Sequence, residues 1–113
     1  MNNVYDTANK LAQEMRNSEE FKQYKDAREK VLANPDLKNK IEEFEKIRYD
    51  VQMLSVEKGA EDPEKMKKLQ EMYVMLVENK EIKEYFDLEV RFNVMVADVN
   101  KIIAQSMEDI FNN

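Results

Sequence analysis

The stretch YFDLEVRFNVMVADVNKI, residues 85–102, carries the clearest structural signal in the chain. Its apolar residues recur at alternating steps of three and four, which places them on one side of an α-helix and is typical of a coiled-coil seam. Val96, Ile103 and Ile110 widen this side into a broader apolar face, as expected for a helix in a bundle. The pattern predicts one long helix from about Lys80 to Phe111. The seam residues are Tyr85, Leu88, Phe92, Met95, Val99 and Ile102.

Helix-start signals divide the rest of the chain into further helices. Ser18, Asn34 and Asn79 each offer a side-chain oxygen that accepts hydrogen bonds from the free N–H groups of a helical first turn. A carboxylate follows each of them within that turn, where the helix dipole favours negative charge. No stretch alternates with period two for long enough to predict a strand. The other expected helices span about Val4 to Arg16, Glu19 to Ala33, Pro35 to Lys58 and Pro63 to Glu78, and the alternative for the last two helices of the chain is one kinked rod.

The missing residue types exclude several classes of function. The chain of 113 residues has no Cys and no His, so it offers no thiol nucleophile, no imidazole base and neither of the commonest zinc ligands. A carboxylate-bound di-iron site in a helical bundle also uses His, so we interpret the many carboxylates as a solvated surface. The single glycine, Gly59, is too few for a phosphate-binding loop and instead predicts a left-handed cap at a helix end. We therefore expect no catalytic, cofactor-binding or metal-binding residues, and no enzymatic activity.

Charge and hydropathy limit the partners. The 18 Lys and Arg against 24 Asp and Glu give a net charge of −6, which disfavours direct nucleic-acid binding because phosphate contacts need clustered cations. No apolar stretch approaches the roughly 20 residues that a membrane helix needs. The first residues also lack the basic and apolar segments of a secretory signal. We therefore expect a cytoplasmic protein that does not associate with membranes.

The length of the helix expected from Lys80 to Phe111 predicts self-association. At about 1.5 Å per residue this helix would be roughly 48 Å long, whereas a compact globule of this chain length is about 34 Å across. Its far end would overhang the globule and expose Ile102 and Ile110 to water. We expect a homodimer or higher homo-oligomer that packs the six seam residues together, the alternative being that the first helix folds back over that end. The predicted fold is one all-α domain, residues 1–113, a five-helix, bundle-like structure with coiled-coil-type dimer packing.

Two further features each allow two interpretations. Eight methionines, six of them from Met53 onward, fit either an adaptable peptide-binding groove or the packing of the core and the dimer seam. Arg48 and Glu89 lie beside apolar stripes, where they either pair across helices or extend their charged ends from the edge of the core.

Three segments together resemble the bacterial YlbF/YmcA family. The run SEEFKQYKDA, residues 18–27, resembles the signature of the second helix of that family. Residues 34–52, from Asn-Pro-Asp-Leu through Phe44 to Val-Gln, are similar to its long third helix, and YFDLE, residues 85–89, opens a long final helix. The resemblance covers nearly the whole chain, with the order and spacing of the segments preserved.

The resemblance implies a small, all-helical, self-associating bacterial protein of the cytoplasm. Better-known members of the family regulate competence, sporulation and biofilm formation, and some form a complex that carries iron–sulfur clusters and promotes RNA processing by an endoribonuclease. Cluster ligation in those members relies on Cys, which this chain lacks, so cluster binding is not transferred. The YheA-like branch of the family fits the chain better for this reason.

Residues and resemblance together lead to one functional hypothesis and an alternative. The hypothesis is a non-enzymatic, cytoplasmic regulatory or adaptor protein that acts through helix-mediated contacts with an unidentified protein partner. The alternative is an accessory factor of an RNA-processing complex built around an endoribonuclease.

Overall fold

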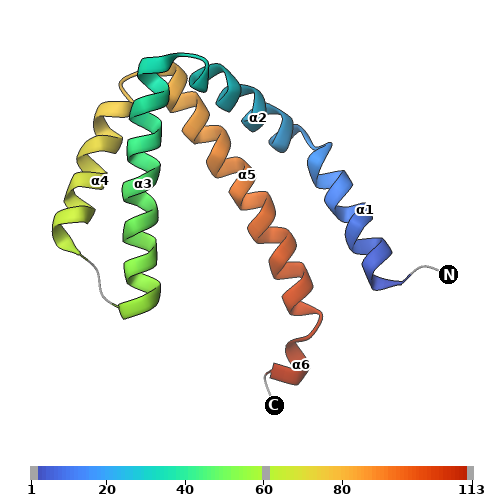
Figure 1. Ribbon diagram of the computed structural model, residues 1–113. Coiled ribbons are helices and arrows are strands. Elements are labelled where there is room, and N and C mark those ends of the chain that lie inside the picture. Colours follow the sequence, from blue (N-terminus) through green and yellow to red (C-terminus); the bar gives the residue numbers. More distant parts are fainter. Residues whose placement is uncertain (1–2, 60–61, 112–113) are drawn as a thin grey trace. The chain divides into compact units, whose positions relative to one another are not determined.

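The chain folds into helices joined by short connections, as Figure 1 shows. The computed structural model describes residues 3–59 and 62–111, and no strand occurs within these two ranges. The all-α prediction is confirmed, and α2 and α4 end one and two residues earlier than the sequence predicts. The helices are α1 (Val4–Arg16), α2 (Glu19–Leu32), α3 (Pro35–Lys58), α4 (Pro63–Leu76), α5 (Lys80–Gln105) and α6 (Glu108–Phe111).

The helix ends follow the capping residues seen in the sequence. The side-chain oxygen of Asn34 accepts hydrogen bonds from two N–H groups of the first turn of α3, at 3.0 and 3.3 Å. Asn79 does the same for α5, at 2.9 and 3.2 Å, so α4 and α5 are separate helices and not one kinked rod. Gly59 caps α3 with a φ of 58°, a left-handed conformation that glycine adopts at little cost. The capping predictions are therefore confirmed.

The prediction of one helix from Lys80 to Phe111 is wrong at its C-terminal end. α5 ends at Gln105, and the short helix α6 follows. The hydroxyl of Ser106 donates a hydrogen bond to the carbonyl of Ile103 at 2.6 Å, and such local bonds compete with the helical pattern. With 26 residues, α5 is about 39 Å long at about 1.5 Å per residue, shorter than the roughly 48 Å expected from the sequence.

The chain consists of two compact units, and both α2 and α5 contribute to each. The central unit is Arg28–Tyr85, and the terminal unit is Met1–Ala27 together with Phe86–Asn113. We describe them one at a time.

The central unit contains most of the hydrophobic core. In it α3 and α4 run antiparallel and side by side (Figure 1). The rings of Phe44 on α3 and Tyr73 on α4 lie 6.4 Å apart between centroids, at an angle of 38°. Ile41 is fully buried. The buried apolar residues of this unit are Val31, Leu37, Ile41, Phe44, Leu76, Ile82 and Tyr85.

The terminal unit is held together mainly by aromatic side chains. Phe92 of α5 packs on two α2 residues, with its ring centroid 5.8 Å from that of Phe21 and 5.2 Å from that of Tyr24. The guanidinium of Arg16 lies over the Phe21 ring at 5.4 Å. Among the residues of this unit that the structure describes, only Phe86 is buried, at 4% exposure. The unit therefore leaves much of its apolar surface in contact with water.

Candidate interaction surfaces

The six seam residues predicted from the sequence do not share one environment. Tyr85 is 1% exposed and belongs to the core of the central unit. Phe92 is half-buried against Phe21 and Tyr24 of the same chain. The rest of the seam is half-buried at Leu88, Met95 and Val99, whereas Ile102 is 67% exposed.

The first part of the seam is therefore used within the chain. Heptad spacing identifies which side chains share one side of a helix, but it does not identify the helix that covers them. The role of the seam in joining two chains stays a prediction, and its more exposed members are Met95, Val99 and Ile102.

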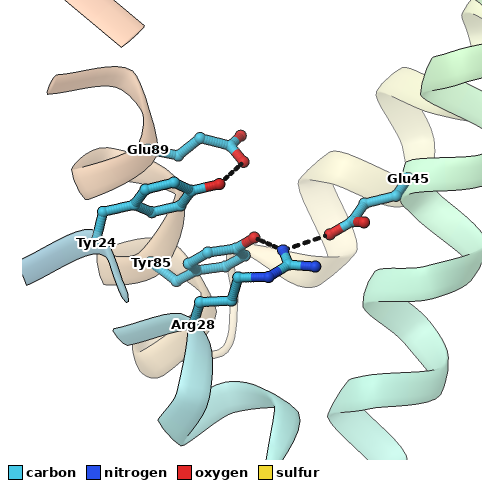
Figure 2. Close-up of polar contacts among 5 residues, drawn as sticks. All are labelled: Tyr24, Arg28, Glu45, Tyr85 and Glu89. Carbon is cyan, nitrogen blue, oxygen red and sulfur yellow. Dashed lines mark hydrogen bonds and ion pairs between the residues drawn. The ribbon is translucent and has the colours of Figure 1, made fainter. Parts of the chain in front are cut away.

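A polar cluster that sequence reasoning missed joins three helices of the central unit. The guanidinium of Arg28 on α2 donates a hydrogen bond to the carboxylate of Glu45 on α3, at 2.9 Å, and a second one to the hydroxyl of Tyr85 on α5 (Figure 2). The bond to Glu45 raises the pKa of Arg28 above its ordinary value, so Arg28 stays charged at any physiological pH. The three residues are far apart in the chain, and no motif could have announced the cluster. Because these contacts hold three helices together, we call the cluster of Arg28, Glu45 and Tyr85 the Arg28 clamp.

Glu89, noted in the sequence as a charge beside an apolar stripe, has a defined contact in the terminal unit. The hydroxyl of Tyr24 donates a hydrogen bond to its carboxylate at 3.0 Å, as Figure 2 shows. In the central unit, the guanidinium of Arg48 lies over the ring of Phe44 at 5.4 Å. Arg48 and Glu89 belong to different units, so a pair between them stays a prediction.

The central unit has an open groove beside α4, which we call the α4 groove. Its volume is about 340 Å³, and more of its lining is apolar than polar. Met75 at its edge is 71% exposed, and Met72 also lines the groove. Met72 and Met75 therefore line an apolar groove of the kind that binds peptides, which is one of the two interpretations of the methionines in the sequence. The lining residues are Leu37, Lys40, Glu43, Lys68, Met72, Met75, Leu76, Asn79 and Ile82.

The terminal unit has a second, shallower groove along α5, which we call the α5 groove. Its volume is about 430 Å³. Val90 and Val94 on its wall are 59% and 53% exposed, on a side of α5 that the heptad reading did not include. In the sequence, the α5 groove could have been recognised from the pattern of polar and apolar residues on the side of α5 that carries Val90 and Val94. The lining residues are Glu20, Val90, Arg91, Val94, Met95, Asp98 and Val99.

The end of α5 and the following turn are uncovered. Every residue from 101 to 110 is exposed, including Ile102 at 67% and Ile110 at 76%. The first helix therefore does not fold back over this end, as one alternative from the sequence had it. The apolar side chains that the sequence places at this end are therefore in contact with water.

The chemistry of the donor groups gives no basis for a metal or cluster site. The sequence has neither Cys nor His, so it offers no thiolate or imidazole ligand for an iron–sulfur cluster. Over residues 3–59 and 62–111, nowhere do three Asp or Glu side chains gather closely enough to hold a metal ion. Within the same ranges, no helix is both long and apolar enough to cross a membrane.

Comparison with known sequences identifies similar proteins. A protein-family model described as "Control of competence regulator ComK, YlbF/YmcA" matches residues 4–108. A UPF0342 protein of Caldicellulosiruptor bescii is 34% identical over 108 residues, covering 96% of this chain and 91% of the relative. A UPF0342 protein of Halothermothrix orenii is 30% identical over 105 residues, covering 93% of this chain and 89% of the relative.

Solved structures show the same fold. A protein of unknown function (DUF964) from Bacillus stearothermophilus matches with a TM-score of 0.80 at 21% identity, over 97% of this chain and 96% of the other. YheA from Bacillus subtilis matches with a TM-score of 0.72 at 23% identity, over 96% and 99%. RicA from Bacillus subtilis, solved in complex with RicF, matches with a TM-score of 0.61 at 18% identity, over 96% of both chains. These structures show the fold, and the family model over residues 4–108 confirms the family resemblance drawn from the sequence.

Proposed function

The chain belongs to the YlbF/YmcA family, and on that premise we propose that it is a non-enzymatic regulatory or adaptor protein of the cytoplasm. It acts by helix-mediated contacts with other proteins, in the control of bacterial development such as competence, sporulation or biofilm formation. The description of the family, control of the competence regulator ComK, supports the regulatory class. RicA, which shares the fold, was solved in complex with another protein, and this supports action through protein–protein contact.

The observation that carries the proposal is the α4 groove. Met75 is 71% exposed at the edge of a groove of about 340 Å³ with a mainly apolar lining. Exposed apolar surface rimmed by polar residues is typical of protein interaction sites, and flexible methionines adapt such a surface to its partner. A groove between helices is also the shape in which an amphipathic helix of a partner binds.

The rim of the groove indicates the charge of the partner. Lys40 and Lys68 contribute two cations and Glu43 one carboxylate, so the rim carries a small excess of positive charge on an otherwise acidic chain. An amphipathic helix with acidic residues beside its apolar stripe complements such a rim. We therefore propose that the partner segment is a helix of this kind.

The test is co-purification from the native host with a tagged form of the full chain. Met75→Glu places a carboxylate at the edge of the groove, and Gln52→Glu on α3 adds the same charge at an exposed position as a matched control. We expect one protein to be retained in stoichiometric amount by the unmodified chain and the control, and to be lost with Met75→Glu. Equal retention by both variants would overturn the role of the α4 groove.

The same eluate distinguishes the alternative function. If the retained partner is an endoribonuclease, or if RNA accompanies it, the accessory-factor hypothesis takes first place. If it is a transcriptional or phosphorelay protein, the regulatory hypothesis is strengthened. Circular dichroism of both variants checks that the helical fold is preserved.

Self-association is the second part of the proposal. The uncovered end of α5, with Ile102 at 67% exposure, and the half-buried Met95 and Val99 are apolar surface that a second chain would cover. We therefore propose a homodimer or higher homo-oligomer. Light scattering at micromolar concentration tests this, because the expected mass is a multiple of the 13.5 kDa of one chain.

A further inference from the structure

One side of α5 carries a regular stripe of exposed residues that the core does not use. Its five members are spaced by steps of four, three, four and three, so they share one side of the helix. Four of them are charged, and the middle one, Val94, is apolar and 53% exposed. We call this set the α5 stripe, and it consists of Asp87, Arg91, Val94, Asp98 and Lys101.

Within the part of the chain that the structure describes, the charges of the α5 stripe have no partners. Over residues 3–59 and 62–111, the side chains of Asp87, Arg91, Asp98 and Lys101 take part in no hydrogen bond or ion pair. Three of the five stripe members, Arg91, Val94 and Asp98, line the α5 groove together with apolar neighbours. The stripe therefore combines unpaired charges with an exposed apolar wall.

The order of charges along the α5 stripe is self-complementary when a second copy of the stripe runs in the opposite direction. Read from Asp87 to Lys101, the stripe is negative, positive, neutral, negative and positive. Read in the opposite direction it is positive, negative, neutral, positive and negative, so each position meets the opposite charge. Two identical helices packed antiparallel produce this pairing, because a two-fold interface places residue i against j and j against i.

The register of this packing follows from the positions. Val94 lies on the two-fold axis against Val94 of the second copy, Arg91 of each copy faces Asp98 of the other, and Asp87 of each faces Lys101 of the other. A parallel arrangement in register would bring like charges together, which is unfavourable. The antiparallel arrangement gives an apolar centre flanked by ion pairs, as in known interfaces.

We propose that a second copy of this chain docks on the α5 stripe in an antiparallel arrangement, with Val94 at the two-fold axis and reciprocal Arg91–Asp98 and Asp87–Lys101 ion pairs. This inference rests on the self-association proposed above, and it names the register. It centres the contact on the α5 stripe, beside Met95 and Val99, which line the same α5 groove. Self-complementary charge is the reason for assigning the stripe to a second copy and not to an unrelated partner.

A charge swap tests the pairing. Arg91→Asp places like charges opposite each other twice in the dimer, and we expect it to raise the dissociation constant about tenfold or more, as measured by sedimentation. The double variant Arg91→Asp with Asp98→Arg restores opposite charges and should recover the affinity of the unmodified chain. Lys46→Asp on α3, an exposed residue outside the stripe, makes the same charge change and should leave the affinity unchanged.

A cross-link tests the register. Since the sequence has no Cys, Val94→Cys can form a disulfide only between the two introduced residues. Position 94 lies on the proposed axis, so we expect a covalent dimer under mild oxidation at micromolar concentration, whereas Asn93→Cys on another side of α5 should stay largely uncoupled. Equal cross-linking of both variants would contradict the register.

The outcomes separate this inference from the proposal on which it rests. A monomeric unmodified chain at micromolar concentration overturns both self-association and the α5 stripe as its surface. If the unmodified chain dimerises but Arg91→Asp does not weaken the dimer, the α5 stripe is not the interface. The same follows if the double variant does not recover the affinity. In both cases self-association itself is unaffected.

Discussion

The two units of this protein differ in how they bury their apolar residues. The central unit places seven apolar side chains in a closed core, with Ile41 fully buried. The terminal unit, which contributes about as much chain, has Phe86 as its single buried residue within the described part of the molecule. Both units are equally helical, so helix formation alone does not explain the difference.

The difference shows which unit covers its own apolar side chains and which unit leaves many of them exposed. In the central unit parts of four helices meet, and the Arg28 clamp to Glu45 and Tyr85 ties three of them together. In the terminal unit the contacts come mainly from one aromatic cluster around Phe92. A unit with few buried side chains opens more easily and gains more from a second chain. The central unit therefore supplies more of the intrinsic stability, and the terminal unit leaves more apolar surface for the self-association that we propose.

The largest expected effect compares an isoleucine of each unit. Ile41→Ala removes a fully buried side chain and leaves a cavity, so we expect it to lower the free energy of unfolding by about 3 kcal/mol. Ile110→Ala changes a side chain that is 76% exposed and should cost less than about 0.5 kcal/mol. Urea unfolding followed by circular dichroism measures both. Equal losses in the free energy of unfolding for the two variants would contradict the difference in burial between the units.

The next effect concerns the aromatic cluster of the terminal unit. Phe92→Leu removes ring contacts with Phe21 and Tyr24 at 5.8 and 5.2 Å between centroids. Each such pair contributes about 0.5–1.5 kcal/mol, so we expect a loss of about 1.5 kcal/mol in the free energy of unfolding. Tyr49→Leu, at a residue that is 61% exposed in the central unit, is the control and should cost less than about 0.5 kcal/mol. A double-mutant cycle with Phe21→Leu should show coupling, and additive losses would argue against the cluster.

A smaller effect is expected at the cap of α3. Gly59→Ala adds a Cβ that meets no atom within 4 Å, so its cost comes only from the left-handed φ of 58°. We expect a loss of about 1 kcal/mol in the free energy of unfolding, and about half of that for Gly59→Asn because asparagine tolerates this conformation better. Thermal unfolding of the two variants compares them. A loss as large as that of Ile41→Ala would show that this loop contributes more than a backbone conformation.

The smallest effect is expected at the Arg28 clamp. The Arg28 side chain is 39% exposed, so solvent screens its interactions, and Arg28→Met should cost about 0.5–1 kcal/mol in the free energy of unfolding. Because the folded state raises the pKa of Arg28 above that of the unfolded chain, its contribution is complete at every pH below the unfolded value and is lost only as pH rises further. The difference from the unmodified chain should therefore be constant between about pH 6 and 9. Lys30→Met, at an exposed residue of the same helix, is the control, and a steep pH dependence in that range would contradict this account.

Local signals in the sequence predicted the helices well because their causes are local. Asn34, Asn79 and Gly59 act on backbone groups within one turn, so their roles are readable from neighbouring residues. The error at the end of α5 has a local cause as well, the hydrogen bond from Ser106 to Ile103, but the apolar pattern continues past it and conceals the break. The Arg28 clamp was not predictable, because Glu45 and Tyr85 are 17 and 57 residues away in the chain.

By itself the sequence determined an all-α chain, the positions where most helices begin, the absence of Cys and His chemistry, and membership of the YlbF/YmcA family. Only the tertiary structure decided which apolar side of α5 is covered. It placed Tyr85 in the core and Phe92 against α2, and it left Val94 exposed. The physical reason is that periodicity fixes which side chains share one side of a helix, whereas the helix that packs against that side depends on contacts between residues far apart in the chain.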